Sequence, residues 1–97
     1  MATFISQVKW TDQGIRNIKD SPNRLEVARA ALRDLGGEIK DVYFTPGEND
    51  LLLIVEAPDG EVMMKFNLAV AAQGNVRTNT TRGFTEAEFQ RIVADLP

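Results

Sequence analysis

The sequence contains neither cysteine nor histidine among its 97 residues. Without cysteine the chain can form no disulfide, no thiolate nucleophile and no thiolate zinc site. Without histidine it has no imidazole general base, no Ser-His-Asp triad and no imidazole metal ligand. If the chain is an enzyme, its acid or base must therefore be an aspartate, a glutamate, a lysine or the single tyrosine, Tyr43.

Several other features are absent. No run of apolar residues is long enough to span a membrane, and the first residues lack the basic and apolar stretches of a signal peptide. No stretch matches a calcium-binding loop or a phosphate-binding glycine loop. With 11 basic and 14 acidic residues, the net charge of −3 argues against a nucleic-acid-binding surface. We therefore expect a cytoplasmic protein with no metal, no cofactor, no nucleic-acid partner and no membrane association.

The composition is that of an ordinary globular protein, with 43% hydrophobic and 26% charged residues. The sequence shows no repeat, low-complexity tract or linker. A chain of 97 residues is long enough to form one modest core. We predict a single domain over residues 1–97.

Apolar periodicity and turn residues divide this domain into strands and helices. Ser21-Pro22 is typical of a helix start, with Ser21 as the N-cap, and Gly36-Gly37 is typical of a helix end. Four strands are expected, over Phe4–Trp10, Ile39–Thr45, Asp50–Glu56 and Val76–Phe84. Thr11–Asp20 should form one or two helical turns or an ordered loop. A further helix should run from Asp59 to Gly74, and a C-terminal helix should follow a capping box at Thr85–Glu88.

The order of these elements is strand, helix, strand, strand, helix, strand and a terminal helix. This order is typical of the split βαβ arrangement. We predict an α+β, ferredoxin-like βαββαβ fold with a four-stranded antiparallel sheet and an additional C-terminal helix. Both crossover helices should lie on one face of the sheet.

The run Leu51–Val55 is apolar at every position, although a half-exposed antiparallel strand should alternate. Since successive side chains point to opposite faces of a sheet, both faces of this strand need cover. Two helices can cover only one face. We expect a second copy of the chain to cover the other, in a homodimer or higher oligomer, because an exposed apolar face promotes aggregation. The alternative is that the terminal helix folds under the sheet.

Several blocks of the sequence resemble the GYD domain family. They are Trp10–Ile15, Lys19–Pro22, Gly36-Gly37, Val55–Asp59, Gly74–Thr78 and Phe84–Glu86. In the stretch that gives the family its name, Gly47 and Asp50 match, whereas Asn49 stands where the tyrosine is expected. The resemblance implies a fold of the dimeric α+β barrel group. It implies no single activity, because that group includes cofactor-independent monooxygenases, small decarboxylases or lactonases, and proteins that only bind ligands or assemble.

The candidates for a ligand site are Trp10, Asp12, Tyr43, Asp50 and Arg77. The aromatic side chains would form apolar walls, the two carboxylates would supply charge, and Arg77 would pair with an anion. Each residue also has a structural interpretation. The aromatic residues would pack in the core or an interface, the aspartates would cap a helix and a turn, and Arg77 would be a solvated residue of an edge strand.

Two functions are consistent with these residues. The leading hypothesis is a protein that binds a small molecule in a pocket between the sheet and the helices, or that only assembles. The alternative is a cofactor-independent enzyme, of the monooxygenase or isomerase type, in which Asp50 is the catalytic base. The polar segment Asp12–Arg24 is either a lid that offers cations to an anionic ligand or a solvated connection.

Overall fold

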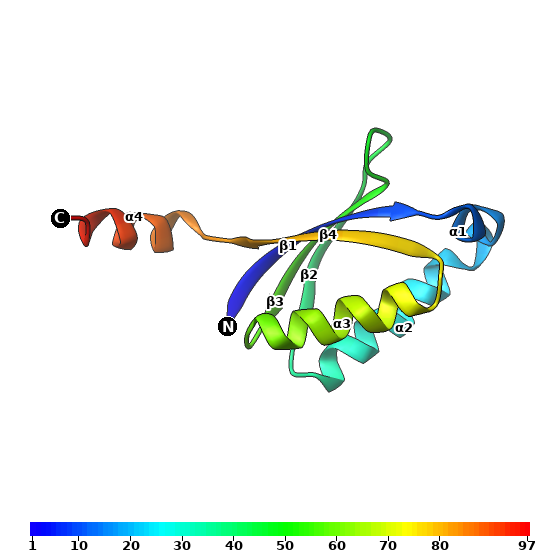
Figure 1. Cartoon of the computed structure of the whole chain (residues 1–97), viewed down its shortest axis with the longest axis horizontal. Coiled ribbons are helices and arrows are strands. Elements are labelled where there is room, and N and C mark those ends of the chain that lie inside the picture. Colours follow the sequence, from blue (N-terminus) through cyan, green and yellow to red (C-terminus); the bar gives the residue numbers. More distant parts are fainter.

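The computed structural model describes all 97 residues and shows an α+β fold built around one antiparallel sheet (Figure 1). The four strands lie in the order β2-β3-β1-β4, so β2 and β4 are the edges. Their bounds are Ala2–Trp10 for β1, Glu38–Phe44 for β2, Leu51–Ala57 for β3 and Val76–Gly83 for β4. This is the strand order of the predicted split βαβ arrangement.

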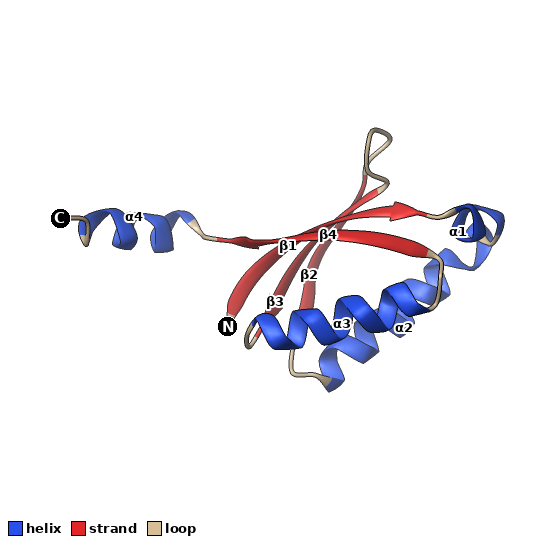
Figure 2. Ribbon diagram, viewed as in Figure 1, coloured by secondary structure: helices blue, strands red, loops and turns tan.

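Both crossover helices, α2 (Ser21–Asp34) and α3 (Gly60–Ala72), cover the same face of the sheet (Figure 2). Before α2 the chain forms a short helix, α1 (Asp12–Arg16), and a 3-10 turn, η1 (Ile18–Asp20). The terminal helix, α4 (Glu86–Ala94), lies beyond the end of β4 (Figure 1). The ferredoxin-like βαββαβ order with an additional C-terminal helix is therefore confirmed.

The core lies between this helical layer and the sheet. Phe4 and Val8 of β1 are buried there, as the alternating pattern of the strand predicts. Leu32 of α2 and Phe66 of α3 belong to the same buried cluster. The strand β3 contributes every second residue to this cluster, namely Leu51, Leu53, Val55 and Ala57.

The opposite face of the sheet carries no helix, and we call it the open face (Figure 1). Leu52 and Ile54 of β3 lie on it, because they alternate with the core positions. Ile5 is paired with Ile54, and Tyr43 with Leu52, so apolar side chains run across three neighbouring strands. The helix α4 projects away from the sheet and leaves this face uncovered. The alternative that the terminal helix folds under the sheet is therefore wrong.

The structure corrects two predicted caps. Ser21 is not an N-cap, because its backbone is already helical (φ −58°, ψ −37°) and α2 continues directly from η1. Asp12 does not cap α1; the hydroxyl of Thr11 accepts the hydrogen bond from the N–H of Gly14, at 3.1 Å. The strand ends differ from the prediction by one or two residues, and a β-bulge at Lys40 interrupts the pairing of β2 with β3.

Three other predicted helix ends are confirmed. Gly36 follows α2 with a positive φ of +88°, a conformation that favours glycine. The carboxylate of Asp59 caps α3 by accepting the N–H of Val62 at 3.0 Å. Thr85 and Glu88 form the predicted reciprocal capping box at the start of α4.

Gly14 marks a tight contact between α1 and the loop before β4. A methyl group on its Cα would overlap the carbonyl oxygen of Asn75. Thr11 joins the same two segments, because its N–H donates to the Asn75 carbonyl at 3.0 Å and its hydroxyl donates to the Gly74 carbonyl at 2.6 Å. These contacts fix α1 against the end of the α3–β4 connection.

Asp50 extends the pairing of β1 with β3 beyond its last residue pair, Val8 and Leu51. Its N–H donates to the Val8 carbonyl at 2.8 Å, and its carboxylate accepts the N–H of Trp10 at 2.9 Å. Asp50 therefore caps a backbone N–H group, but this group belongs to the neighbouring strand β1 and not to the turn that the structural interpretation predicts.

We predict that Gly14→Ala lowers the free energy of unfolding by about 1–3 kcal/mol, because the new methyl group must displace a backbone carbonyl. In an unrestricted helix the same change is favourable by about 1 kcal/mol. Urea unfolding followed by circular dichroism measures the difference. The control is Gly47→Ala, whose methyl group would meet no atom within 4 Å. Equal stability of the two variants would contradict the tight contact.

We predict that Asp50→Ala lowers the free energy of unfolding by about 1–3 kcal/mol, because the N–H of Trp10 loses its acceptor. Asp50→Asn keeps an acceptor oxygen and should lose less than half as much. The same unfolding experiment compares the two variants. Wild-type stability in both would show that the carboxylate does not support this end of the sheet.

Candidate functional site

An apolar pocket lies between the sheet and the two crossover helices, toward the end of the sheet where β1 meets α1. Its volume is about 120 Å³, and most of its lining is hydrophobic. The sheet provides one wall through Val8, Leu51 and Leu53, and the helices provide the other through residues that include Leu25 and Ala28 of α2 and Val70 of α3. Such a pocket suits a small ligand with an apolar body.

Besides the buried Phe66, two aromatic side chains lie in the outer wall of this pocket. Trp10 ends β1 and Phe44 ends β2, and their ring centroids are 6.4 Å apart. Phe44 is 58% exposed, so this pair lines the solvent-facing part of the pocket. The structure thus places Trp10 where the ligand-wall hypothesis requires it, next to an aromatic residue that the sequence interpretation did not single out.

A buried hydroxyl group supplies the pocket with a polar point on the sheet side. Ser6 is only 2% exposed, lines the pocket, and lies within 2.9 Å of the Thr80 hydroxyl on β4. The side-chain amide of Asn67 on α3 donates to the same Thr80 oxygen at 3.1 Å. The carbonyl oxygen of that amide is buried without a hydrogen-bond partner. This network of side-chain hydrogen bonds therefore has one unused acceptor, the Oδ1 atom of Asn67.

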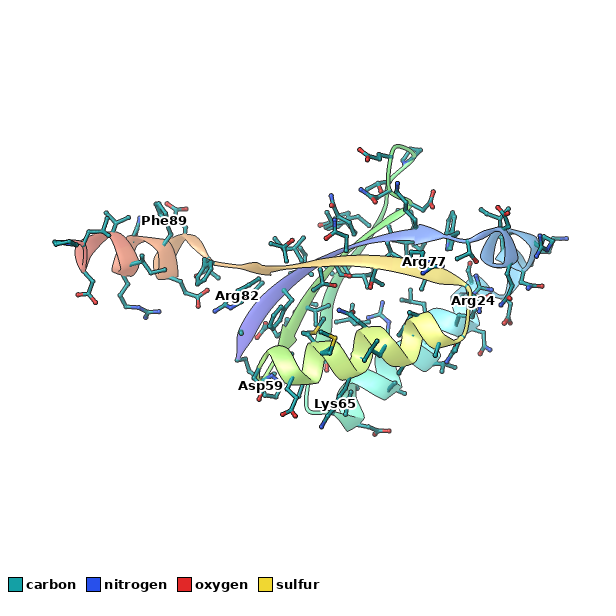
Figure 3. The ribbon with its side chains drawn as sticks, in the orientation of Figure 1. Arg24, Asp59, Lys65, Arg77, Arg82 and Phe89 are labelled. Atoms are coloured by element: carbon teal, nitrogen blue, oxygen red, sulfur yellow. The ribbon has the colours of Figure 1, made fainter.

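Arg24 is the single charged residue in the lining of the pocket. It comes from α2, and Figure 3 shows it near the junction of that helix with the end of the sheet. Its guanidinium group donates to the carbonyl of Asn17 at 2.6 Å and to that of Gly14 at 3.4 Å. These two bonds hold the cation in place and leave further N–H groups for an anionic ligand. Arg24 lies in the predicted lid segment Asp12–Arg24.

The other predicted site residues do not join Trp10 in this pocket. Tyr43 is 59% exposed on the open face. Arg77 is also on the open face, directly opposite Lys9. Asp12 is exposed at the start of α1, and the carboxylate of Asp50 is bonded to the backbone of β1. The five residues therefore do not form one common site.

A second, polar groove lies on the open face beside the β2–β3 hairpin. Lys9 and Arg77 contribute cations, and the hairpin tip contributes Glu48 and Asn49. Gln7, Thr78 and Asn79 complete the lining, which contains no hydrophobic residue. The hairpin tip therefore leans over the open face, and Arg77 belongs to this groove.

Two local ion pairs shift the pKa values of their members. A hydrogen bond between Arg33 and Glu38 raises the pKa of the guanidinium and lowers the pKa of the carboxyl. At the start of α4, the backbone N–H of Thr85 lowers the pKa of the Glu88 carboxyl, and Arg82 contributes in the same direction. These contacts attach the end of α2 to β2 and the start of α4 to β4.

No cluster of three or more acidic side chains is placed to hold a metal ion. No helix combines the length and apolarity needed to cross a bilayer.

Comparison with solved structures supports the fold. The chain superposes on the crystal structure of MtbAldR with a TM-score of 0.68 and 22% identity, covering 88% of this chain and 52% of that one. A feast or famine regulatory protein from M. tuberculosis, complexed with L-methionine, gives a TM-score of 0.66 at 20% identity, covering 88% of this chain and 51% of that one. The chain spans about half the length of these proteins.

Sequence comparison finds a relative whose length is similar to that of this chain. The chain is 32% identical over 90 residues to the "Glutamine synthetase and cystathionine beta-lyase binding protein" of Thermus thermophilus, covering 92% of this chain and 95% of that protein. Residues 4–93 match the GYD domain, as the sequence blocks predict. The chain therefore belongs to the GYD domain family.

Proposed function

We propose that this chain is a binding domain that holds a small molecule in the apolar pocket between its sheet and its crossover helices. The observation that carries the proposal is the combination of apolar walls with one fixed cation, Arg24. A pocket of this kind favours a compact ligand with an apolar body and an acidic group. Small aromatic or aliphatic carboxylates have this chemistry.

Apolar residues, a cation and a hydroxyl group of the lining would each contact a different part of the ligand. Leu25, Ala28 and Val70 would exclude water from the apolar part of the ligand. The guanidinium of Arg24 would pair with the acidic group, and its existing bonds to two carbonyls reduce the entropy cost of that contact. The hydroxyl of Ser6 would accept or donate one hydrogen bond at the sheet.

We further propose that two copies pair through their open faces. The apolar side chains of Ile5, Leu52 and Ile54 lie together on this face, and the chain has no other element that covers them. Burying them against a second copy removes an aggregation-prone surface from water. Strands from both copies would then form the two layers of the dimeric α+β barrel that the family resemblance implies.

The alternative of an enzyme that uses Asp50 as a base receives no support from the geometry. The carboxylate accepts the backbone N–H of Trp10 and is not among the residues that line the pocket. A general base must reach the proton that it removes. The contacts of Asp50 instead fit its structural role in pairing β1 with β3.

A second candidate function is binding to another protein. It is supported by the 32% identical relative from Thermus thermophilus, whose name describes it as a binding protein for glutamine synthetase and cystathionine beta-lyase. In this chain the exposed surface for such a partner would include apolar residues such as Met64 and Leu68 on the outer side of α3. A cytoplasmic location, expected from the absence of cysteine, fits either function.

We predict that Ala28→Phe abolishes binding of phenylacetate, because the new ring fills the pocket. Trp10 is the only tryptophan and lies in the pocket wall, so its fluorescence reports binding directly. Ala30→Phe is the matched control, since Ala30 is an exposed residue of the same helix outside the lining. Equal affinity of the two variants, or no fluorescence response in the wild-type chain, would contradict the pocket proposal.

We predict that Arg24→Gln weakens the binding of phenylacetate about tenfold, because a charge-assisted hydrogen bond is lost. The affinity for phenylacetamide, which has the same ring without the charge, should change less than twofold. Fluorescence titration of both compounds separates the ionic contact from a general loss of the pocket. An equal loss for both would mean that Arg24 only supports the local structure.

We predict that Leu52→Asp converts the oligomer into a monomer, because a carboxylate cannot be buried unpaired between two sheets. Leu68→Asp, on the 63% exposed position of α3, should leave the mass unchanged. Sedimentation velocity measures both. An unchanged mass in the Leu52 variant would rule out pairing through the open face.

A further inference from the structure

The helix α4 is amphipathic but has no packing partner in its own chain. Phe89, Ile92 and Val93 of α4, and Leu96 just after the helix, are each between 45% and 64% exposed. A helix of nine residues is only marginally stable in water on its own. The radius of gyration, 14.7 Å, exceeds the roughly 12.5 Å of a compact domain of this length, in accordance with a projecting arm. The apolar side of α4 therefore needs another surface.

The start of α4 is held in its outward direction. Only Phe84 and Thr85 connect it to β4. The guanidinium of Arg82 lies 4.3 Å from the centroid of the Phe84 ring and 3.4 Å from the Glu88 carboxylate, and the capping box fixes Thr85. The helix consequently continues the line of β4 instead of folding back (Figure 1). The partner of its apolar side must come from another chain.

The apolar side of α4 and the open face point in the same direction. Figure 3 shows Phe89 on the side of α4 that is turned away from α2 and α3. The open face is also turned away from these helices. One second copy, laid over the open face, would therefore reach the apolar side of α4 as well.

The hairpin determines which end of that copy meets α4. The β2–β3 hairpin rises from the open face, whereas α4 leaves the opposite end of the sheet (Figure 1). Two copies with parallel long axes would bring their raised hairpins against each other. With antiparallel long axes, each hairpin would instead stand beside the α4 helix of the other copy. The contact is then the same in both directions, as a two-fold axis requires.

The charges at the two surfaces are complementary. Lys9 and Arg77 are directly opposite each other on β1 and β4, near the hairpin tip, and neither takes part in an ion pair. Like charges in this position are unfavourable unless an anion joins them. Glu48 is the one acidic residue in their groove. The arm formed by α4 and its C-cap, Asp95, carries three acidic residues and one basic residue, Arg91. Glu88 is already paired with Arg82, so Glu86 and Asp95 are the acidic residues left for a partner.

From these observations we propose that α4 is an arm that docks on a second copy of this chain, against the hairpin end of its open face. The apolar side of α4 would pack beside the raised hairpin, and the two acidic residues that are not already in an ion pair, Glu86 and Asp95, would face Lys9 and Arg77. Each copy gives one arm and receives one. This inference rests on the pairing of open faces proposed above, and it assigns α4 and the hairpin groove to the same interface.

Paramagnetic broadening between copies tests the docking site. Because the chain has no cysteine, Gln90→Cys gives a single position for a spin label on α4. Spin-labelled chains are mixed with ¹⁵N-labelled chains that carry no spin label. We expect broadening of the amide signals of Lys9, Asn49 and Arg77 in the ¹⁵N-labelled copy. The same label at Met64→Cys, on the outer side of α3, should leave them sharp.

The outcomes separate the two proposals. Two outcomes would overturn the docking of α4 and leave the pairing of open faces intact. They are a dimer mass without broadening at the hairpin end, and a dimer mass with broadening confined to the partner's α4. A monomer mass overturns both.

A pair of substitutions on α4 gives an independent measurement. Ile92→Asp should weaken dimerisation roughly 100-fold, because each dimer loses two buried isoleucines. Gln90→Asp introduces the same charge on the other side of the helix and should change the dissociation constant less than threefold. Sedimentation equilibrium measures both constants. Equal effects of the two substitutions would overturn the docking of the apolar side.

Discussion

The organisation of the molecule depends on one constraint, which is that β3 is apolar on both sides. Leu51, Leu53 and Val55 face the helices and form the centre of the core. Leu52 and Ile54 face the other way, and no helix of the chain is placed over them. A chain of this length has enough helix to cover one side of its sheet. Self-association is the physical consequence that we draw for the other side.

On the other face, the helices α2 and α3 cover the sheet incompletely. Small residues such as Ala28 on α2 and Ala69 on α3 leave space above the sheet, and this space is the apolar pocket. The link between α1 and the start of α2 then places Arg24 in its wall, bonded to the carbonyls of Asn17 and Gly14. A tight contact at Gly14 thus positions the cation that gives the pocket its proposed preference for acidic ligands.

The fold could be predicted from the sequence, because its signals are local. Alternation and helix caps such as Asp59 and Thr85 identify the elements, and their order identifies the topology. The site could not be predicted to the same extent. The bulge at Lys40 reverses the alternation within β2, so the sequence does not reveal that Phe44, and not Tyr43, turns toward the pocket. The partner of Asp50 is 40 residues away in the chain, and no local pattern indicates it.

The mass of the wild-type chain in solution tests the central claim most directly. Sedimentation equilibrium over a range of concentrations gives this mass without any substitution. We predict a dimer of the 10.8 kDa chain, or a multiple of that dimer. A monomer at concentrations well above those in the cell would show that the open face is stable in water, and would contradict the account.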